Sequence, residues 1–356
     1  MTMTKHNAIV LADGYFRTPN GKGAHGLVRG SDRFNVLAVV DATCAGQDAG
    51  VALDGTHRDI PVVASVEEAT SGSEKPSHAI VGIATHGGRF TDEVRSWILE
   101  AIGAGLSIIN GLHDATSEDA EISAAAERAG VELTDLRKPK PKRELHFWTG
   151  EIVNVKAPRL AIMGTDCAIG KRTTARLLME ALKANGINAE MIYTGQTGWM
   201  QGAPHGFVLD SVANDFVSGE LEHAIVSCDR ELSPDVILIE GQSSLRNPSG
   251  PCGSEFLCSG GATGVVLHHA IGRVYFEGYE EEGFKIPEPA DEIALIQHYG
   301  ARTIGLTINA EGVDADDVVA RKSALADSLA LPVMDPIVDG VDALIPAVRQ
   351  FIAQGR

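Results

Sequence analysis

The residues best suited to chemistry lie between Arg159 and Ala175, where an apolar run enters a loop bracketed by Gly164 and Gly170 and followed by Lys171. Backbone N–H groups of such a loop converge on an anion, and the next helix adds the positive end of its dipole. The pattern therefore predicts a phosphate-binding loop. The residues expected to contact the phosphates are Gly164, Thr165, Asp166, Cys167, Ala168, Ile169, Gly170, Lys171, Arg172, Thr173 and Thr174.

One position departs from the pattern of ATP-dependent enzymes. In those enzymes the residue after the lysine is Ser or Thr, whose hydroxyl binds the Mg²⁺ that bridges the reacting phosphates. Here that residue is Arg172. We therefore interpret the loop as one that binds phosphates as a handle, without reaction at phosphorus.

Further polar side chains follow the other strands of the same predicted sheet. A buried run ends in Glu240, where a carboxylate lies beside a phosphate loop and either holds a metal through water or acts as a general base. Gln242 and Arg246 come next, and Gln196 lies in a glycine-rich loop after the strand 187–194. We expect these three to bind the substrate, Arg246 through a fork suited to a carboxylate or phosphate.

Cys167 and the pair His268–His269 allow other chemistry. A thiol near a helix N-terminus has a lowered pKa, so a covalent acyl-enzyme on Cys167 is an alternative to direct transfer, although a small residue that fits a tight loop explains it as well. Adjacent histidines on a strand point to opposite faces, so we expect no shared metal ion.

A second group of candidates lies near the amino terminus. Lys22, His25 and Arg29 share a glycine-rich segment after the first strand, which makes a suitable pocket for an anionic substrate. A Gly-x-Gly-x-x-Gly fingerprint is missing there, which disfavours a nicotinamide-dependent enzyme.

The elements that must position these residues alternate between strand and helix. Strands 8–12, 36–40, 60–63, 78–84 and 107–110 with a helix 91–103 predict an open α/β sheet, and the strand–helix–strand unit around the phosphate loop starts a second. Five cations and two prolines in 137–143 indicate a connector. We predict a Rossmann-like domain over 1–136, a basic linker over 137–150, and a P-loop NTPase-like parallel α/β domain over 151–356.

Composition excludes several partner classes. The 356 residues carry a formal net charge of −18, which disfavours nucleic acid and anionic membranes. No apolar run approaches the roughly 20 residues that cross a bilayer, and the start of the chain has no signal-peptide pattern, so a cytoplasmic protein is expected. The five cysteines lack zinc-site spacing and fit reduced thiols.

Taken together, four motifs resemble a two-domain phosphate-loop family, formerly of unknown function, whose members are described as D-glutamate N-acetyltransferases. These are 21–29, 164–174, 193–198 and 239–242, and the resemblance covers nearly the whole chain. It implies transfer of the acetyl group of acetyl-CoA to the amine of D-glutamate by a homo-oligomer, a dimer or a tetramer, with no metal required.

The residues agree with that implication. Coenzyme A carries phosphates that are never cleaved, as a loop with Arg172 after its lysine suggests, and D-glutamate carries two carboxylates for the Lys22, His25 and Arg29 segment. Deprotonation of the ammonium group requires a base, for which Glu240, Asp166 and His25 are the candidates in falling order.

Two other classes stay open. The motif Gly-Thr-Asp-x-x-x-Gly-Lys also resembles dethiobiotin synthetase and related ATP- and Mg²⁺-dependent ligases or kinases. In that reading Thr173 or Thr174 reaches the metal and Glu240 becomes its partner. The third class is a nucleotide-sensing regulator without catalytic activity, which the polar residues at both sheet edges disfavour.

Overall fold

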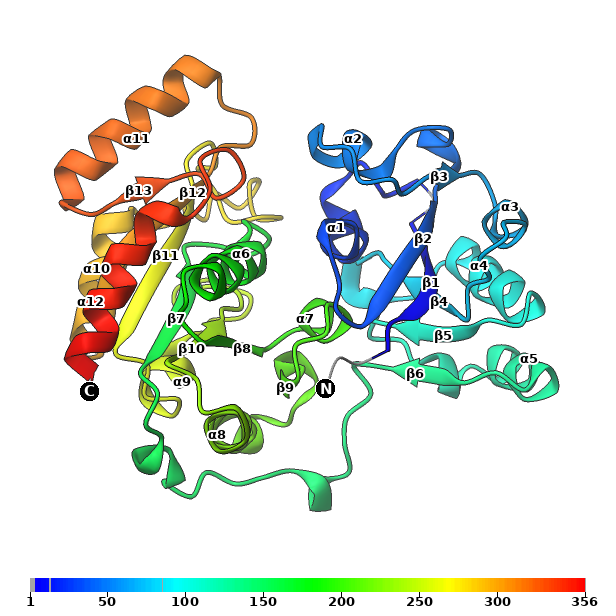
Figure 1. Ribbon diagram of the computed structural model, residues 1–356, viewed down its shortest axis with the longest axis horizontal. Helices are drawn as coiled ribbons and strands as arrows, with labels where there is room; N and C mark the ends of the chain where they lie inside the picture. Colours follow the sequence, from blue (N-terminus) through cyan, green and yellow to red (C-terminus); the bar gives the residue numbers. More distant parts are fainter. Residues whose placement is uncertain (1–3, 13, 85, 356) are drawn as a thin grey trace. The chain divides into compact units, whose positions relative to one another are not determined.

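The computed structural model describes residues 4–12, 14–84 and 86–355. The chain divides into two compact units (Figure 1). The first runs to Lys140 and includes Gln196–Ala203, and the second comprises Pro141–Gly195 and the chain from Pro204 onward. Each unit is built on its own parallel sheet.

The first unit contains a six-stranded sheet in the order β3-β2-β1-β4-β5-β6, with every pair parallel. Its strands are β1 (His6–Leu11), β2 (Phe34–Val40), β3 (Val62–Val63), β4 (His78–Val81), β5 (Ser107–Asn110) and β6 (Leu133–Asp135). Its helices are α1 (Lys22–Arg29), α2 (Ala49–Asp54), α3 (Val66–Thr70), α4 (Asp92–Gly103) and α5 (Ala120–Ala129). The central strands are apolar on both faces because helices cover each side of a parallel sheet.

The second unit contains a seven-stranded sheet in the order β13-β12-β11-β7-β10-β8-β9, again parallel throughout. Its strands are β7 (Arg159–Gly164), β8 (Ala189–Tyr193), β9 (His205–Gly206), β10 (Val236–Glu240), β11 (Gly264–Ala270), β12 (Arg302–Asn309) and β13 (Val333–Met334). Its helices are α6 (Lys171–Ala184), α8 (Asn214–Leu232), α9 (Ser254–Cys258), α10 (Pro289–His298), α11 (Ala315–Leu329) and α12 (Ile345–Gly355). The strand β7 is central, so the loop that follows it opens at the middle of the carboxyl edge.

The segment after β8 differs from its prediction as a glycine-rich loop. It forms a short helix, α7 (Gln196–Met200), which belongs to the first unit although its neighbours in sequence belong to the second. Apolar side chains hold α7 in the first unit, because Met200 is buried in the core of that unit and Trp199 packs against the core. Gln201 adds hydrogen bonds from its Nε2 to the carbonyls of Gly26 and Gly30.

The basic segment is split between the units. Lys138 donates to Ser117 Oγ in the first unit, at 2.9 Å. Residues 146–152 instead lie on α8, where the buried carboxylates of Glu220 and Glu222 accept their backbone N–H groups. Within the part of the chain that the structure describes, every helix is too short or too polar to cross a bilayer.

Candidate functional site

The loop between β7 and α6 requires its glycines. Gly170 has φ of 121°, a conformation that side chains rarely adopt. At Gly164 an added Cβ would lie 2.8 Å from Cδ of Lys171, so the lysine stem occupies that space. Ala168 also has a positive φ, 51°, which is strained for a residue with a side chain. The sequence therefore folds into a tight, partly strained turn over the start of α6.

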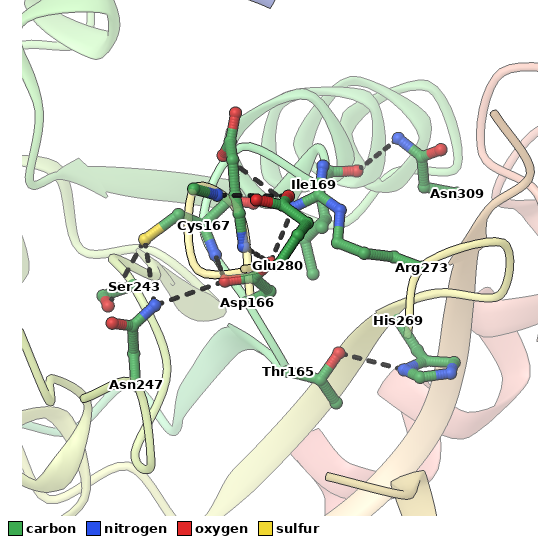
Figure 2. A network of polar contacts seen from close by, with 12 residues as sticks. Thr165, Asp166, Cys167, Ile169, Ser243, Asn247, His269, Arg273, Glu280 and Asn309 are labelled. Carbon is green, nitrogen blue, oxygen red and sulfur yellow. Dashed lines mark hydrogen bonds and ion pairs between the residues drawn. The ribbon is translucent and has the colours of Figure 1, made fainter. Parts of the chain in front are cut away.

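The carbonyl groups of this loop already have donors. Asn309, at the end of β12, donates its Nδ2 to the carbonyl of Ile169 at 2.9 Å, and Arg273 donates to that of Cys167 at 3.0 Å (Figure 2). Lys171 Nζ lies 2.5 Å from the carbonyl of Asp166. Among the described residues, the N–H groups of Ala168, Ile169 and Gly170 donate to no acceptor. They are the donors that an anion at the helix N-terminus would use.

Asp166 lies at the centre of the contacts in Figure 2. Its carboxylate is fully buried and accepts from Arg273 Nη1 at 2.7 Å and from the N–H of Glu277 at 2.9 Å. Asn247 Nδ2 and the N–H of Cys167 complete the set on the other oxygen. With both oxygens occupied, this geometry favours a role in holding the loop over the predicted role as a base.

Cys167 faces the loop that follows β10. Its Sγ lies 3.4 Å from Ser243 Oγ and 3.6 Å from Asn247 Nδ2. Ser243 has a φ of 43°, so the two loops that meet here both contain a non-glycine residue in the left-handed region. Such strain is found where surrounding contacts over-determine the backbone, as they do at many binding sites.

Glu240 ends β10 inside this edge and is 3% exposed. Burial raises the pKa of its carboxyl group, and the opposing effects of Arg172, of the Thr194 and Gly195 backbone and of Lys171 do not compensate. Its Oε2 accepts from the N–H of Thr194 at 3.0 Å. A buried carboxylate with a raised pKa is suited to taking a proton near neutral pH.

Gln242 lies next to Glu240 and is fixed by the same threonine. Its Nε2 donates to Thr194 Oγ1 at 3.1 Å, while that hydroxyl donates to the carbonyl of Glu240 at 2.8 Å. Gly195 allows this approach, because an added Cβ would lie 2.8 Å from Gln242 Nε2 and 3.6 Å from Glu240 Oε1. The structure thus brings Glu240 and Gln242 together at one narrow place.

Arg246 is 40% exposed and is held by Glu292 of α10, whose Oε2 accepts from Arg246 Nε at 2.8 Å. Burial raises the pKa of Glu292, and Arg246 acts against that rise. One nitrogen of the guanidinium group is thereby anchored, which orients the remainder.

The other predicted substrate-binding residues lie in the first unit, three of them on α1 and Gln196 on α7. Lys22 begins α1 and is exposed, whereas Arg29 ends the same helix and pairs with Asp54 at 3.2 Å. His25 Nε2 lies 2.6 Å from the carbonyl of Phe16. Gln196 is buried in α7 and accepts from Arg137 at 3.2 Å.

Sequence reasoning missed Arg273, Asn247 and Asn309, which hold the phosphate loop. Each follows a strand or loop at the carboxyl edge, which is the only signal the sequence offered. In the described ranges, no group of three or more His, Cys, Asp or Glu side chains is arranged to hold a metal ion.

Fold and loop together define a two-domain protein in which a Rossmann-like sheet precedes a P-loop domain. A family model described as "Domain of unknown function (DUF1611_C) P-loop domain" matches residues 146–345. A second, "Domain of unknown function (DUF1611_N) Rossmann-like domain", matches residues 42–139. The chain belongs to the DUF1611 family, and the predicted fold class and family resemblance are confirmed.

Known relatives of the chain agree with this assignment. A D-glutamate N-acetyltransferase from Pseudoalteromonas sp is 30% identical over 276 residues, which cover 75% of this chain and 79% of that protein. Another, from Tritonibacter scottomollicae, is 27% identical over 289 residues, covering 80% and 84%. The crystal structure of a DUF1611 family protein from Anabaena variabilis has a TM-score of 0.87 at 28% identity and covers 97% of this chain and 100% of that one.

Proposed function

We propose that this protein transfers the acetyl group of acetyl-CoA to the amine of D-glutamate. The names of the two relatives support the reaction. The single structural observation that carries the proposal is the pairing of two features at one sheet edge. A phosphate loop with unused N–H donors lies beside Glu240, a buried carboxylate with a raised pKa.

The phosphate loop fits coenzyme A as a handle. Its N–H groups at Ala168, Ile169 and Gly170 and the positive end of α6 suit a pyrophosphate that is bound and never cleaved. Acetyl-CoA supplies the activated thioester carbonyl. The protein therefore needs no group that attacks phosphorus, which agrees with Arg172 at the position of the metal-binding hydroxyl.

Glu240 acts as the general base in this proposal. It accepts a proton from the ammonium group of D-glutamate, so that the neutral amine attacks the thioester carbonyl. The C–S bond then breaks, and the second proton lost by the nitrogen goes to the thiolate sulfur, which leaves as the thiol of coenzyme A. Gln242, held by Thr194, orients the amine or the developing oxyanion through its amide. Arg246 offers the rest of its anchored guanidinium group to a substrate carboxylate.

Two observations bear on the alternatives. The ligase hypothesis requires Thr173 or Thr174 to reach a metal ion. Thr174 is fully buried, and its Oγ1 lies 3.1 Å from Nδ1 of His268. That hydroxyl is directed into the protein, which leaves only Thr173 for the ligase reaction. The thiol of Cys167, for its part, contacts the Ser243 hydroxyl and the Asn247 amide, and neither of these groups is a base that could activate it.

A metal-free thiol-release assay tests the proposal. The protein is incubated with EDTA, acetyl-CoA and separately D-glutamate, L-glutamate or D-aspartate, and the N-acetyl product is detected by mass. We expect thiol release and N-acetyl-D-glutamate with D-glutamate. No product under these conditions, with ADP formed once Mg-ATP and a carboxylic acid are supplied, would replace the proposal with the ligase reaction.

A further inference from the structure

Two adjacent histidines near the end of β11 contact both ends of the phosphate loop. Strand β11 pairs with β7 so that His268 lies opposite Gly164, and the carbonyl of His268 accepts from the N–H of Thr165 at 3.0 Å. The two side chains project to opposite faces of the strand. They therefore reach different parts of the loop, and neither is used by the chemistry proposed above.

His268 lies under the carboxyl end of the loop and is 2% exposed. Its Nδ1 is 2.6 Å from Oγ1 of Thr307 in β12 and 3.1 Å from Oγ1 of Thr174 in α6. The ring thus links the first turn of α6 to the sheet. It also limits position 170, since a Cβ added to Gly170 would lie 3.2 Å from His268 Nε2.

The Nε2 atom of His268 is buried and has no hydrogen-bond partner among the described residues. An unpaired polar atom of this kind is unfavourable, and an apolar side chain of similar size would avoid the loss. A histidine here is therefore explained by its other nitrogen, Nδ1, which bridges the two threonine hydroxyls.

His269 contacts the opposite end of the loop. Its Nδ1 lies 2.9 Å from Thr165 Oγ1, as Figure 2 shows. Burial lowers the pKa of His269 to about 4, and burial together with the nearby Lys171 lowers that of His268 to about 3. Both rings are neutral near neutral pH, so they shape the loop without adding charge to it.

We propose that His268 and His269 are positioning residues that fix the two ends of the phosphate loop through their Nδ1 atoms. His269 holds Thr165 at the start, and His268 holds Thr174 and supports Gly170 at the end. This inference rests on the phosphate-binding part of the proposed function and not on acetyl transfer. Its consequence is that the pair sets the affinity for the phosphate-bearing substrate and leaves the chemical step largely unchanged.

Substitution of each histidine by asparagine or by glutamine tests which of the two ring nitrogens matters. The Asn amide takes the place of Nδ1 and keeps a partner for the hydroxyls, whereas the longer Gln reaches the position of Nε2 and leaves them unpaired. We expect His268→Gln and His269→Gln to weaken binding of inorganic pyrophosphate and of coenzyme A about tenfold, comparable to one lost hydrogen bond. His268→Asn and His269→Asn should change it less than about threefold.

Kinetics and a second pair of variants separate positioning from general damage to the fold. In the Gln variants KM for acetyl-CoA should rise while kcat and KM for D-glutamate stay near their original values. If His268→Gln does not fold, the same contrast is made at the other partner. Thr174→Ser keeps the hydroxyl and should bind pyrophosphate normally, whereas Thr174→Val should not.

The pyrophosphate measurement keeps this inference separate from the proposed reaction. Suppose that the Asn variants bind pyrophosphate and the Gln variants bind it more weakly, while the protein has no acetyltransferase activity. That result would support the positioning role of the two histidines and refute the proposed function. Equal affinity in the two variants, or binding lost in His268→Asn and kept in His268→Gln, would overturn the inference even in an active acetyltransferase.

Discussion

A carboxylate ends a strand in each unit, Asp135 in β6 and Glu240 in β10, and the two have different surroundings. In the first unit Asp135 accepts from Asn110 Nδ2, from the N–H and Oγ1 of Thr116 and from the N–H of Ser117. Burial opposes its ionisation, but these hydrogen bonds outweigh burial and the pKa of Asp135 is lowered. In the second unit Glu240 is more deeply buried with weaker compensation, and its pKa is raised.

This contrast separates structural from chemical carboxylates. A carboxylate with a full set of donors stabilises the loop that supplies them, as Asp135 and Asp166 do, and the donors to Asp135 also lower its pKa. A carboxylate left short of donors destabilises the fold in its charged form, yet it is able to exchange a proton near neutral pH. We therefore propose that Glu240 is the group that exchanges a proton with the substrate.

The largest expected effect is that of Glu240→Gln. Loss of a general base should lower kcat by about 10²- to 10⁴-fold. Because the raised pKa makes ionised Glu240 unfavourable to folding, its contribution to stability is fully present below the unfolded pKa and is lost as the pH rises through the folded pKa. The variant should therefore melt at the same or a higher temperature at pH 8. A lower melting temperature there would contradict this account of Glu240.

Asp135→Asn is the matched substitution in the first unit. The amide places N–H groups against the donors of Asn110 or Thr116, so we expect a loss of about 1–3 kcal/mol in the free energy of unfolding. Activity per folded molecule should persist. Chemical denaturation and assays at a temperature where the variant is folded measure the two quantities. A kcat for Asp135→Asn as low as that of Glu240→Gln would contradict the distinction between a structural Asp135 and a chemical Glu240.

Gly170→Ala tests the loop itself. At φ of 121° and against His268, an alanine should distort the cradle and raise the dissociation constant for coenzyme A about tenfold or more. Gly186→Ala is the control, since that glycine also has a positive φ, 75°, but an added Cβ would meet nothing within 4 Å. The control should lose stability alone. Equal loss of coenzyme A binding in both variants would show that the effect comes from backbone strain in general and not from the shape of the phosphate loop.

The smallest expected effect is on acid stability. His268 and His269 have folded pKa values of about 3 and about 4, both depressed. Their contribution is present above the unfolded value of roughly 6.5 and is lost as the pH falls through the folded values. A double Asn variant should therefore show a shallower fall in stability between pH 6 and 4. An unchanged pH dependence would mean that both histidines are protonated in the folded protein.

The sequence predicted those parts of the site that are formed by residues close together in the chain. Two short segments contain these parts. One holds Gly164, Gly170 and Lys171 after an apolar run, which is typical of a phosphate-binding loop, and the other is an apolar strand that ends at Glu240. The family resemblance followed from the same runs. For this reason the two parallel sheets and the phosphate loop were predictable.

The contacts that depend on the order of the strands in the sheet could not be predicted from the sequence. Arg273 and Asn309 reach the loop because β11 lies beside β7 and β12 lies beside β11, and no local run of residues specifies that order. The helix α7 was mistaken for a loop because its glycines outweighed Trp199 and Met200, whose burial becomes visible only in the fold. Three of the four donors to Asp166 come from segments distant in sequence, Asn247, Arg273 and Glu277, so no local pattern indicated that its carboxylate is fully hydrogen-bonded.

The pH dependence of kcat at saturating acetyl-CoA and D-glutamate tests the central claim most directly. If Glu240 is the base, kcat rises with pH through an inflection above the usual range of a glutamate, and Glu240→Gln loses both the inflection and most of the rate. An inflection that persists unchanged in Glu240→Gln, at an undiminished rate, would contradict the assignment and return the search for the base to the rest of the site.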